Sequence, residues 1–147
     1  MYGLLLALHI LAATIWTGGH IILSLVILPK AMKNRDLPEL MNFEAAYERI
    51  GIPALLIQVV TGIMLAYRIL PDVSLWFDLS NPIALSITLK LSLLTLTALL
   101  ALDARFRVIP KLSESNMVGL AWHIIPVTIF AILFVLVGVS FRTGWFV

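Results

Sequence analysis

Four apolar segments, each long enough to cross a lipid bilayer as a helix, set the strongest limit on what this chain can fold into. A hydrocarbon core of about 30 Å takes roughly 20 helical residues. Hydrophobic residues fill 61% of the 147 positions and charged residues only 12%, far from the composition of a soluble domain. The segments lie at about 2–28, 50–70, 83–104 and 118–141. The sequence therefore predicts a single all-α integral membrane domain over 1–147.

The distribution of basic residues predicts the orientation of this domain. The first and third connections carry most of them: Lys30, Lys33, Arg35, Arg105, Arg107 and Lys111. By the positive-inside rule these connections face the cytoplasm, and both termini face the outer, periplasmic side. Short connections favour an antiparallel four-transmembrane-helix bundle. We expect a multi-pass protein of the inner (cytoplasmic) membrane whose partner is the lipid bilayer. No nucleic-acid partner is expected, because basic residues gather only near the membrane surface.

The second transmembrane helix is predicted to begin well before the membrane. Asp36 followed by Glu39 is a capping-box-like start, and LPELMNFEAAYERIG continues at helical spacing from about residue 37. Gly51 and Pro53 predict a bend near the membrane surface, because proline removes a backbone donor and clashes with the preceding turn.

Two histidines interrupt the first apolar run, LLALHILAATIWTGGHIIL, at His9 and His20. Eleven residues at about 100° each place both on one face of a helix, about 16 Å apart along its axis, so they cannot share a ligand. Counting the helical rise from each segment end puts His9, Met64 and Lys90 at one outer depth. The same count puts His20 and His123 at one inner depth, within the error of the helix ends.

Ligation is one interpretation of these layers, because imidazole is the nitrogen ligand of haem iron, copper and zinc. The alternative is that His9, His20 and His123 are core imidazoles bonded to carbonyls or hydroxyls. Lys90 also has several interpretations: snorkelling to the headgroups, a hydrogen bond to an anionic cofactor, direct ligation or proton transfer. The chain has no cysteine, which excludes thiolate metal sites.

Other polar positions carry weaker signals. The Gly18-Gly19 pair either lets two helices approach closely or clears room for a flat macrocycle beside His20. Arg68 and Arg142 lie at the outer rim, where they serve as interfacial anchors or bind anionic groups such as propionates. Asp103, beside Arg105 and Arg107, is interpreted as part of a solvated helix end and receives no chemical role.

Several of these stretches together resemble a known family. They are LLALHILAATIWTGGH, FEAAYERIGIPALLIQVVTGIMLAYR, the lysine in ITLKLSL and the AWHI of the fourth segment. They are similar to the small stand-alone members of the copper resistance protein D (CopD) family. The first-segment histidine, the second-segment Thr-Gly and the third-segment lysine are also similar to small four-helix membrane protoporphyrinogen oxidases, which bind haem b. That second resemblance implies haem binding at His9 and Lys90.

The leading functional hypothesis is a membrane-embedded protein that binds one or two b-type haems and acts in electron transfer or haem-linked oxidation. His20 and His123 would form an inner axial pair, and His9, with Met64 or Lys90, an outer site. The alternative is a copper-binding or copper-transport protein that uses the same histidines. A purely structural subunit is a third hypothesis. No catalytic residue or redox partner is assigned. Because four helices enclose little volume for a macrocycle, an intersubunit site in a homodimer is also considered.

Overall fold

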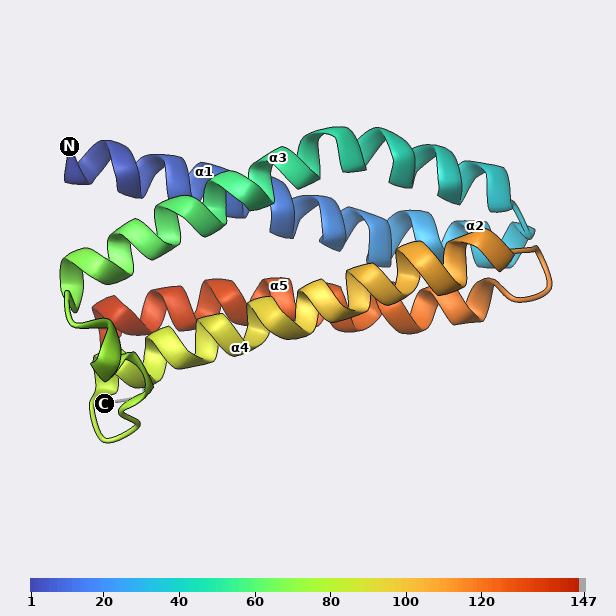
Figure 1. Cartoon of the computed structure of the whole chain (residues 1–147). Helices are drawn as coiled ribbons and strands as arrows, with labels where there is room; N and C mark the ends of the chain where they lie inside the picture. Colours follow the sequence, from blue (N-terminus) through green and yellow to red (C-terminus); the bar gives the residue numbers. More distant parts are fainter. Residues whose placement is uncertain (146–147) are drawn as a thin grey trace.

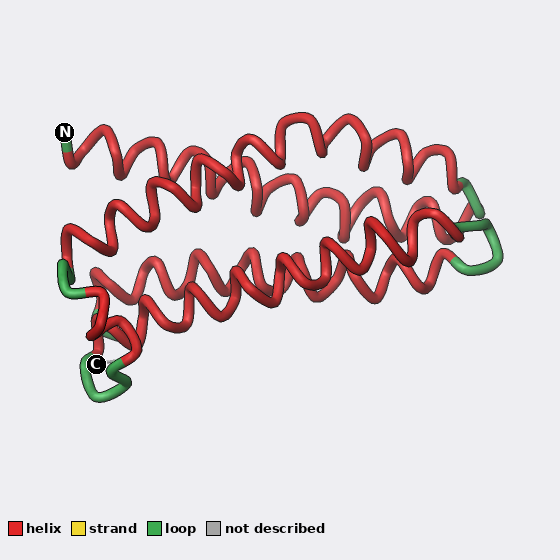
Figure 2. The backbone as a smooth tube through the Cα atoms, viewed as in Figure 1, coloured by secondary structure: helices red, strands yellow, loops and turns green. Residues whose placement is uncertain are grey.

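The computed structural model describes residues 1–145, and these are all-helical apart from short connections (Figures 1 and 2). Within this range four helices are long and apolar enough to cross a membrane: Tyr2–Asn34, Leu37–Ile69, Pro82–Lys111 and Met117–Thr143. Large apolar side chains face outward, as lipid-exposed positions require; Leu25, Phe106 and Trp122 expose 71, 73 and 73% of their surface. The predictions of an all-α fold and of a multi-pass membrane protein are confirmed.

The first membrane-length helix has three parts. α1 spans Tyr2–Ile22 and runs through a π-helical segment, Leu23–Ile27, into α2, Leu28–Asn34. It ends where Arg35 adopts a left-handed conformation, with φ 53°. This end lies beyond residue 28, the predicted boundary, because polar residues here continue the helix past its apolar part.

The other three long helices begin at recognisable caps. α3 spans Leu37–Ile69, and the Asp36 side chain accepts a hydrogen bond from the Glu39 amide. α4 spans Pro82–Asp103, capped by Asn81, and continues through a π-helical segment, Ala104–Val108, and a 3-10 turn, Ile109–Lys111. α5 spans Met117–Thr143. A 3-10 turn, Val73–Phe77, lies between α3 and α4.

The long helices lie side by side, and the chain reverses direction at each connection (Figure 1). α1 packs mainly against α3 and α5, and α4 packs against α5. α3 also meets the continuation of α4, where Arg105 forms an ion pair with Glu48 at 3.3 Å. The N-terminus and the C-terminal end of α5 lie at the same end of the molecule. α3, which contains Pro53, is visibly curved.

Candidate functional site

His9 lies at the contact between α1 and α3, with one ring nitrogen fixed. Its Nδ1 is 2.9 Å from the Thr61 hydroxyl oxygen, and that hydroxyl donates to the carbonyl of Ile57 at 2.6 Å. Because the hydroxyl proton is directed to Ile57, the hydroxyl oxygen accepts from His9, and Nδ1 carries the ring proton. The His9 Nε2 atom has no hydrogen-bond partner within residues 1–145. A lone pair on Nε2 is thereby left available to a ligand.

His20 is held in a similar way one level deeper. Its Nδ1 donates to the carbonyl of Trp16 at 2.9 Å, and the Tyr47 hydroxyl donates to the same carbonyl at 2.8 Å. The His20 ring is buried and lies 4.3 Å from the Trp16 ring, centroid to centroid. No partner for its Nε2 atom is found in the described part of the chain. Both α1 histidines therefore have Nδ1 anchored and Nε2 free.

Lys90 extends from α4 toward α5, where a glycine leaves room for it. A Cβ atom on Gly138 would lie 3.4 Å from the Lys90 Nζ, and this ammonium lies 5.4 Å from the centre of the Phe141 ring. A cation over an aromatic face is stabilised by the ring quadrupole. Lys90 forms no ion pair with any of the residues that the structure describes.

Five residues from the four long helices form two contacts in the half of the fold that contains the N-terminus, which the sequence predicts to be the outer half. His9 meets Thr61 and Gly62 between α1 and α3, and Lys90 meets Gly138 between α4 and α5. We call this group the outer cluster. Each glycine lies beside one of the two basic side chains. A Cβ on Gly62 would lie 3.0 Å from His9 Cε1, as a Cβ on Gly138 would lie close to Lys90. His9 and Lys90, two of the three residues predicted for an outer layer, thus each lie beside a glycine of a neighbouring helix. Met64, the third, is 48% exposed.

Buried polar atoms without a partner lie close to this cluster. Trp16 Nε1 and Gln58 Oε1 are inaccessible to solvent and bond to nothing within the described residues. Gln58 is one helical turn from Thr61, and Trp16 lies between His9 and His20 along α1. Buried polar groups nearly always have a partner, and exceptions point to a missing water, ion or cofactor. The Trp16 donor and the Gln58 acceptor are therefore available to such a group, between the depths of His9 and His20.

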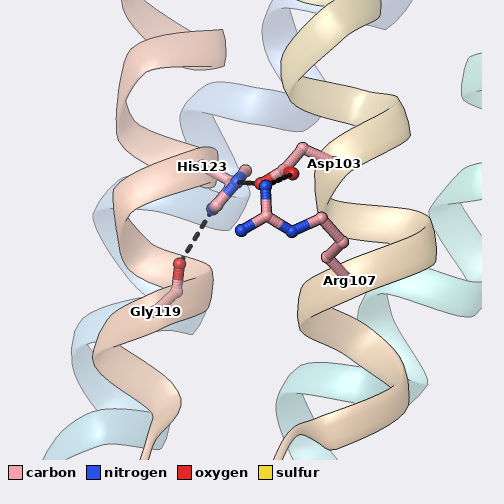
Figure 3. Close-up of polar contacts among 4 residues, drawn as sticks. All are labelled: Asp103, Arg107, Gly119 and His123. Atoms are coloured by element: carbon pink, nitrogen blue, oxygen red, sulfur yellow. Dashed lines mark hydrogen bonds and ion pairs between the residues drawn. The ribbon is translucent and has the colours of Figure 1, made fainter.

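His123 has a different environment from the one predicted (Figure 3). Its Nδ1 donates to the Gly119 carbonyl at 2.9 Å, and its Nε2 lies 2.8 Å from a carboxylate oxygen of Asp103. Arg107 donates to the other carboxylate oxygen at 2.8 Å. Both ring nitrogens of His123 are therefore engaged, and this residue does not join His20 as a second free imidazole.

The reason is the direction in which His123 faces, which a depth count does not give. Thr128 on α5 faces α1, because its hydroxyl donates to the His20 carbonyl at 3.2 Å. His123 precedes Thr128 by five residues, which is about 140° around the helix. It therefore faces α4 and Asp103. Reasoning from the sequence missed Asp103 as a partner of His123. The signal that could have found it is its position: Asp103 lies at the end of the third apolar segment, and His123 lies near the start of the fourth, so an antiparallel pair of helices would place them at similar depths.

The His123–Asp103 contact is expected to stabilise the C-terminal end of α4 against the N-terminal part of α5. In a double-mutant cycle built from Asp103→Ala and His123→Ala, we expect a coupling free energy of about 1 kcal/mol, typical of a partly buried hydrogen bond to a carboxylate. The control cycle, Asp103→Ala with Arg107→Ala, tests a largely exposed pair one turn apart, and its coupling should be below about 0.5 kcal/mol. Unfolding by SDS in mixed micelles measures both values. Equal couplings in the two cycles would contradict this assignment.

The two arginines predicted for the outer rim have different surroundings. Met64 and Arg68 line a pocket at the outer end of α3, together with Tyr67 and Trp76. Arg142 lies in the last turn of α5 and is not in this lining.

Comparison of the chain with known protein families, with curated proteins and with solved structures finds no match.

Proposed function

We propose that this chain is a membrane-embedded haem b-binding protein that acts in electron transfer or haem-linked oxidation, and that it is a small relative of the CopD family. The observation that carries the proposal is the fixed orientation of His9, whose Nδ1–H is bonded to Thr61 while Nε2 is left free. Histidines that bind a metal through one nitrogen almost always donate the other N–H to a fixed acceptor. His9 already has this second contact.

The other residues of the outer cluster fit an anionic macrocycle. Gly62 and Gly138 carry no side chain where it would crowd His9 and Lys90. The Lys90 ammonium, which has no carboxylate partner in the described chain, would pair with a propionate or act as a second ligand. The unpaired Gln58 Oε1 is a further polar atom within one turn of Thr61. Bound haem would supply a one-electron couple inside the bilayer.

His20 is proposed as the ligand of a second, inner position. Its free Nε2 lies at a level about 16 Å along α1 from that of His9. His123 is left out of this proposal, because Asp103 and Gly119 engage both of its nitrogens. Since each level of one chain offers a single free imidazole among the described residues, a homodimer would supply the second axial ligand where one is needed.

We further propose that the helices form an antiparallel bundle in the inner membrane, with both termini on the periplasmic side. The basic connection residues and the shared location of the two chain ends support this orientation. Electrons would then pass between the two histidine levels, from one membrane face toward the other.

Copper bound by the same imidazoles is the alternative. The described residues contain no group of three or more His, Cys, Asp or Glu side chains placed to hold a metal ion. Met64, the methionine expected at the outer depth, is half-exposed and lines a pocket with Tyr67 and Arg68. Copper(I) favours clustered soft ligands, so the geometry supports haem better than copper.

The absorption spectrum of the protein tests the proposal directly. The chain is expressed with haem supplied, purified in mild detergent, and recorded oxidised and after reduction with dithionite. A Soret band with sharp reduced α and β bands is expected. A featureless visible spectrum together with stoichiometric copper in metal analysis would favour the alternative, and the absence of both would leave the histidines as structural residues.

A further inference from the structure

A pocket of about 500 Å³ lies at the outer end of α3, outside the outer cluster. Its lining is Ile63, Met64, Tyr67, Arg68, Val73 and Trp76. Five of these six side chains are apolar or aromatic, and Arg68 supplies the only charge in this set. The volume lies within the range of about 300 to 1,000 Å³ that is usual for small-ligand sites.

One wall of the pocket is held in place by hydrogen bonds. The Trp76 indole donates from Nε1 to the Leu70 carbonyl at 2.8 Å, and the Trp76 carbonyl accepts from the Thr88 hydroxyl at 2.6 Å. Asp72 caps the 3-10 turn by accepting from the Ser74 amide at 2.9 Å. Trp76 is 7% exposed, although it follows a surface loop. The pocket is therefore formed by a fixed indole rather than by a loose connection.

The charge in the pocket has no protein partner. Within the described residues Arg68 takes part in no ion pair and no hydrogen bond to a side chain, and none of the lining residues is acidic. Arg68 lies in the last turn of α3, at the end of a membrane-length helix. Ile63 precedes it by five residues, so the lining spans about 7.5 Å along the axis of α3, measured between the backbone positions of Arg68 and Ile63.

We propose that this pocket binds an anionic phospholipid. The guanidinium of Arg68 holds the headgroup phosphate, for which its planar fork of donors is suited. The upper part of one acyl chain lies on Met64 and Ile63, against the Trp76 indole. A cationic headgroup would find no carboxylate among the lining residues, which favours a lipid with net negative charge. This proposal does not depend on haem binding.

Native mass spectrometry of the full chain in mild detergent, titrated with phosphatidylglycerol or phosphatidylcholine, tests the selectivity. We expect phosphatidylglycerol to bind several-fold more tightly. Arg68→Gln should abolish this preference, whereas Arg142→Gln, which removes an outer arginine outside the pocket, should keep it. If Arg68→Gln and Arg142→Gln lose the preference for phosphatidylglycerol equally, the preference reflects general attraction of anionic lipid to the basic protein surface, and the proposal is overturned. Equal affinity of the wild type for both lipids would also overturn it.

Quenching of tryptophan fluorescence locates the bound lipid. The protein is placed in nanodiscs that contain phosphatidylglycerol or phosphatidylcholine brominated near the top of the acyl chain, at the same mole fraction. The fluorescence of Trp76 is obtained as the difference between the wild type and Trp76→Phe. We expect brominated phosphatidylglycerol to quench Trp76 more than brominated phosphatidylcholine, and Arg68→Gln to make the two equal. Headgroup-independent quenching of Trp76 in the wild type would place the lipid elsewhere.

Discussion

His9→Ala is expected to reduce bound haem at least tenfold, with loss of the reduced α band. The variant removes the free Nε2 atom that the proposed function assigns as the axial ligand, and a methyl group offers nothing in its place. The measurement is the haem-to-protein ratio and the reduced-minus-oxidised spectrum of each purified variant. Far-UV circular dichroism checks that the helices are retained.

Two further variants make the result specific. Thr61→Val keeps the imidazole but removes the acceptor of its Nδ1–H, so we expect haem to be retained with about 10- to 100-fold weaker affinity. His123→Ala should leave the spectrum in place, because both nitrogens of His123 are bonded to Asp103 and Gly119. Loss of the spectrum in His123→Ala, with an unchanged spectrum in His9→Ala, would favour the axial pair predicted from the sequence and reject the site described above.

The helical architecture follows from the sequence because a bilayer fixes the length of any segment that crosses it. About 20 apolar residues are needed, and the four long runs satisfy this condition without detailed knowledge of packing. Depth follows almost as directly from the rise per residue. Counting predicts one level for His9 and Lys90; in the structure His9 lies against Gly62 of α3, and Lys90 lies against Gly138 of α5.

The direction of a side chain is a harder problem in a helix that is apolar on every side. The lipid-facing and core-facing sides of such a helix have similar hydropathy, so the pattern that reveals a buried face in soluble proteins is weak. His123 illustrates the difficulty, since its depth matched His20 but it faces Asp103. The π-helical segments Leu23–Ile27 and Ala104–Val108 add to it, because each changes the angular phase of the residues that follow.

The Gly18-Gly19 pair shows how a correct signal can remain ambiguous. The sequence allowed helix packing or space for a macrocycle. In the structure the two glycines differ: a Cβ on Gly18 would meet no atom within 4 Å in the described chain, whereas Gly19 lies directly against the Tyr47 ring. No rule of composition separates neighbouring residues that point about 100° apart on a helix. Only the position of Tyr47 on α3 does so.

Gly19→Ala is therefore expected to destabilise the fold, while Gly18→Ala is not. A methyl group at Gly19 would overlap the Tyr47 ring, and moving that ring endangers the hydrogen bond from its hydroxyl to the Trp16 carbonyl. Overpacking costs about 1 to 3 kcal/mol, and the hydrogen bond is worth about 1 kcal/mol more. At Gly18 the methyl group has room, and alanine's better helix propensity favours the variant by up to about 1 kcal/mol. The free energy of unfolding in SDS-containing mixed micelles measures both effects.

The overlap can be isolated from other effects of the substitution by removing its partner. In a Tyr47→Ala background the ring is gone, so adding Gly19→Ala should cost little, and the double variant should be more stable than the sum of the single changes predicts. The expected coupling is about 1 to 3 kcal/mol, the size of the relieved overpacking. If Gly19→Ala costs the same with and without Tyr47, α1 and α3 do not approach at this point. His20, whose Nδ1 lies 3.2 Å from the Tyr47 hydroxyl, would then have a different environment from the one on which its proposed role depends.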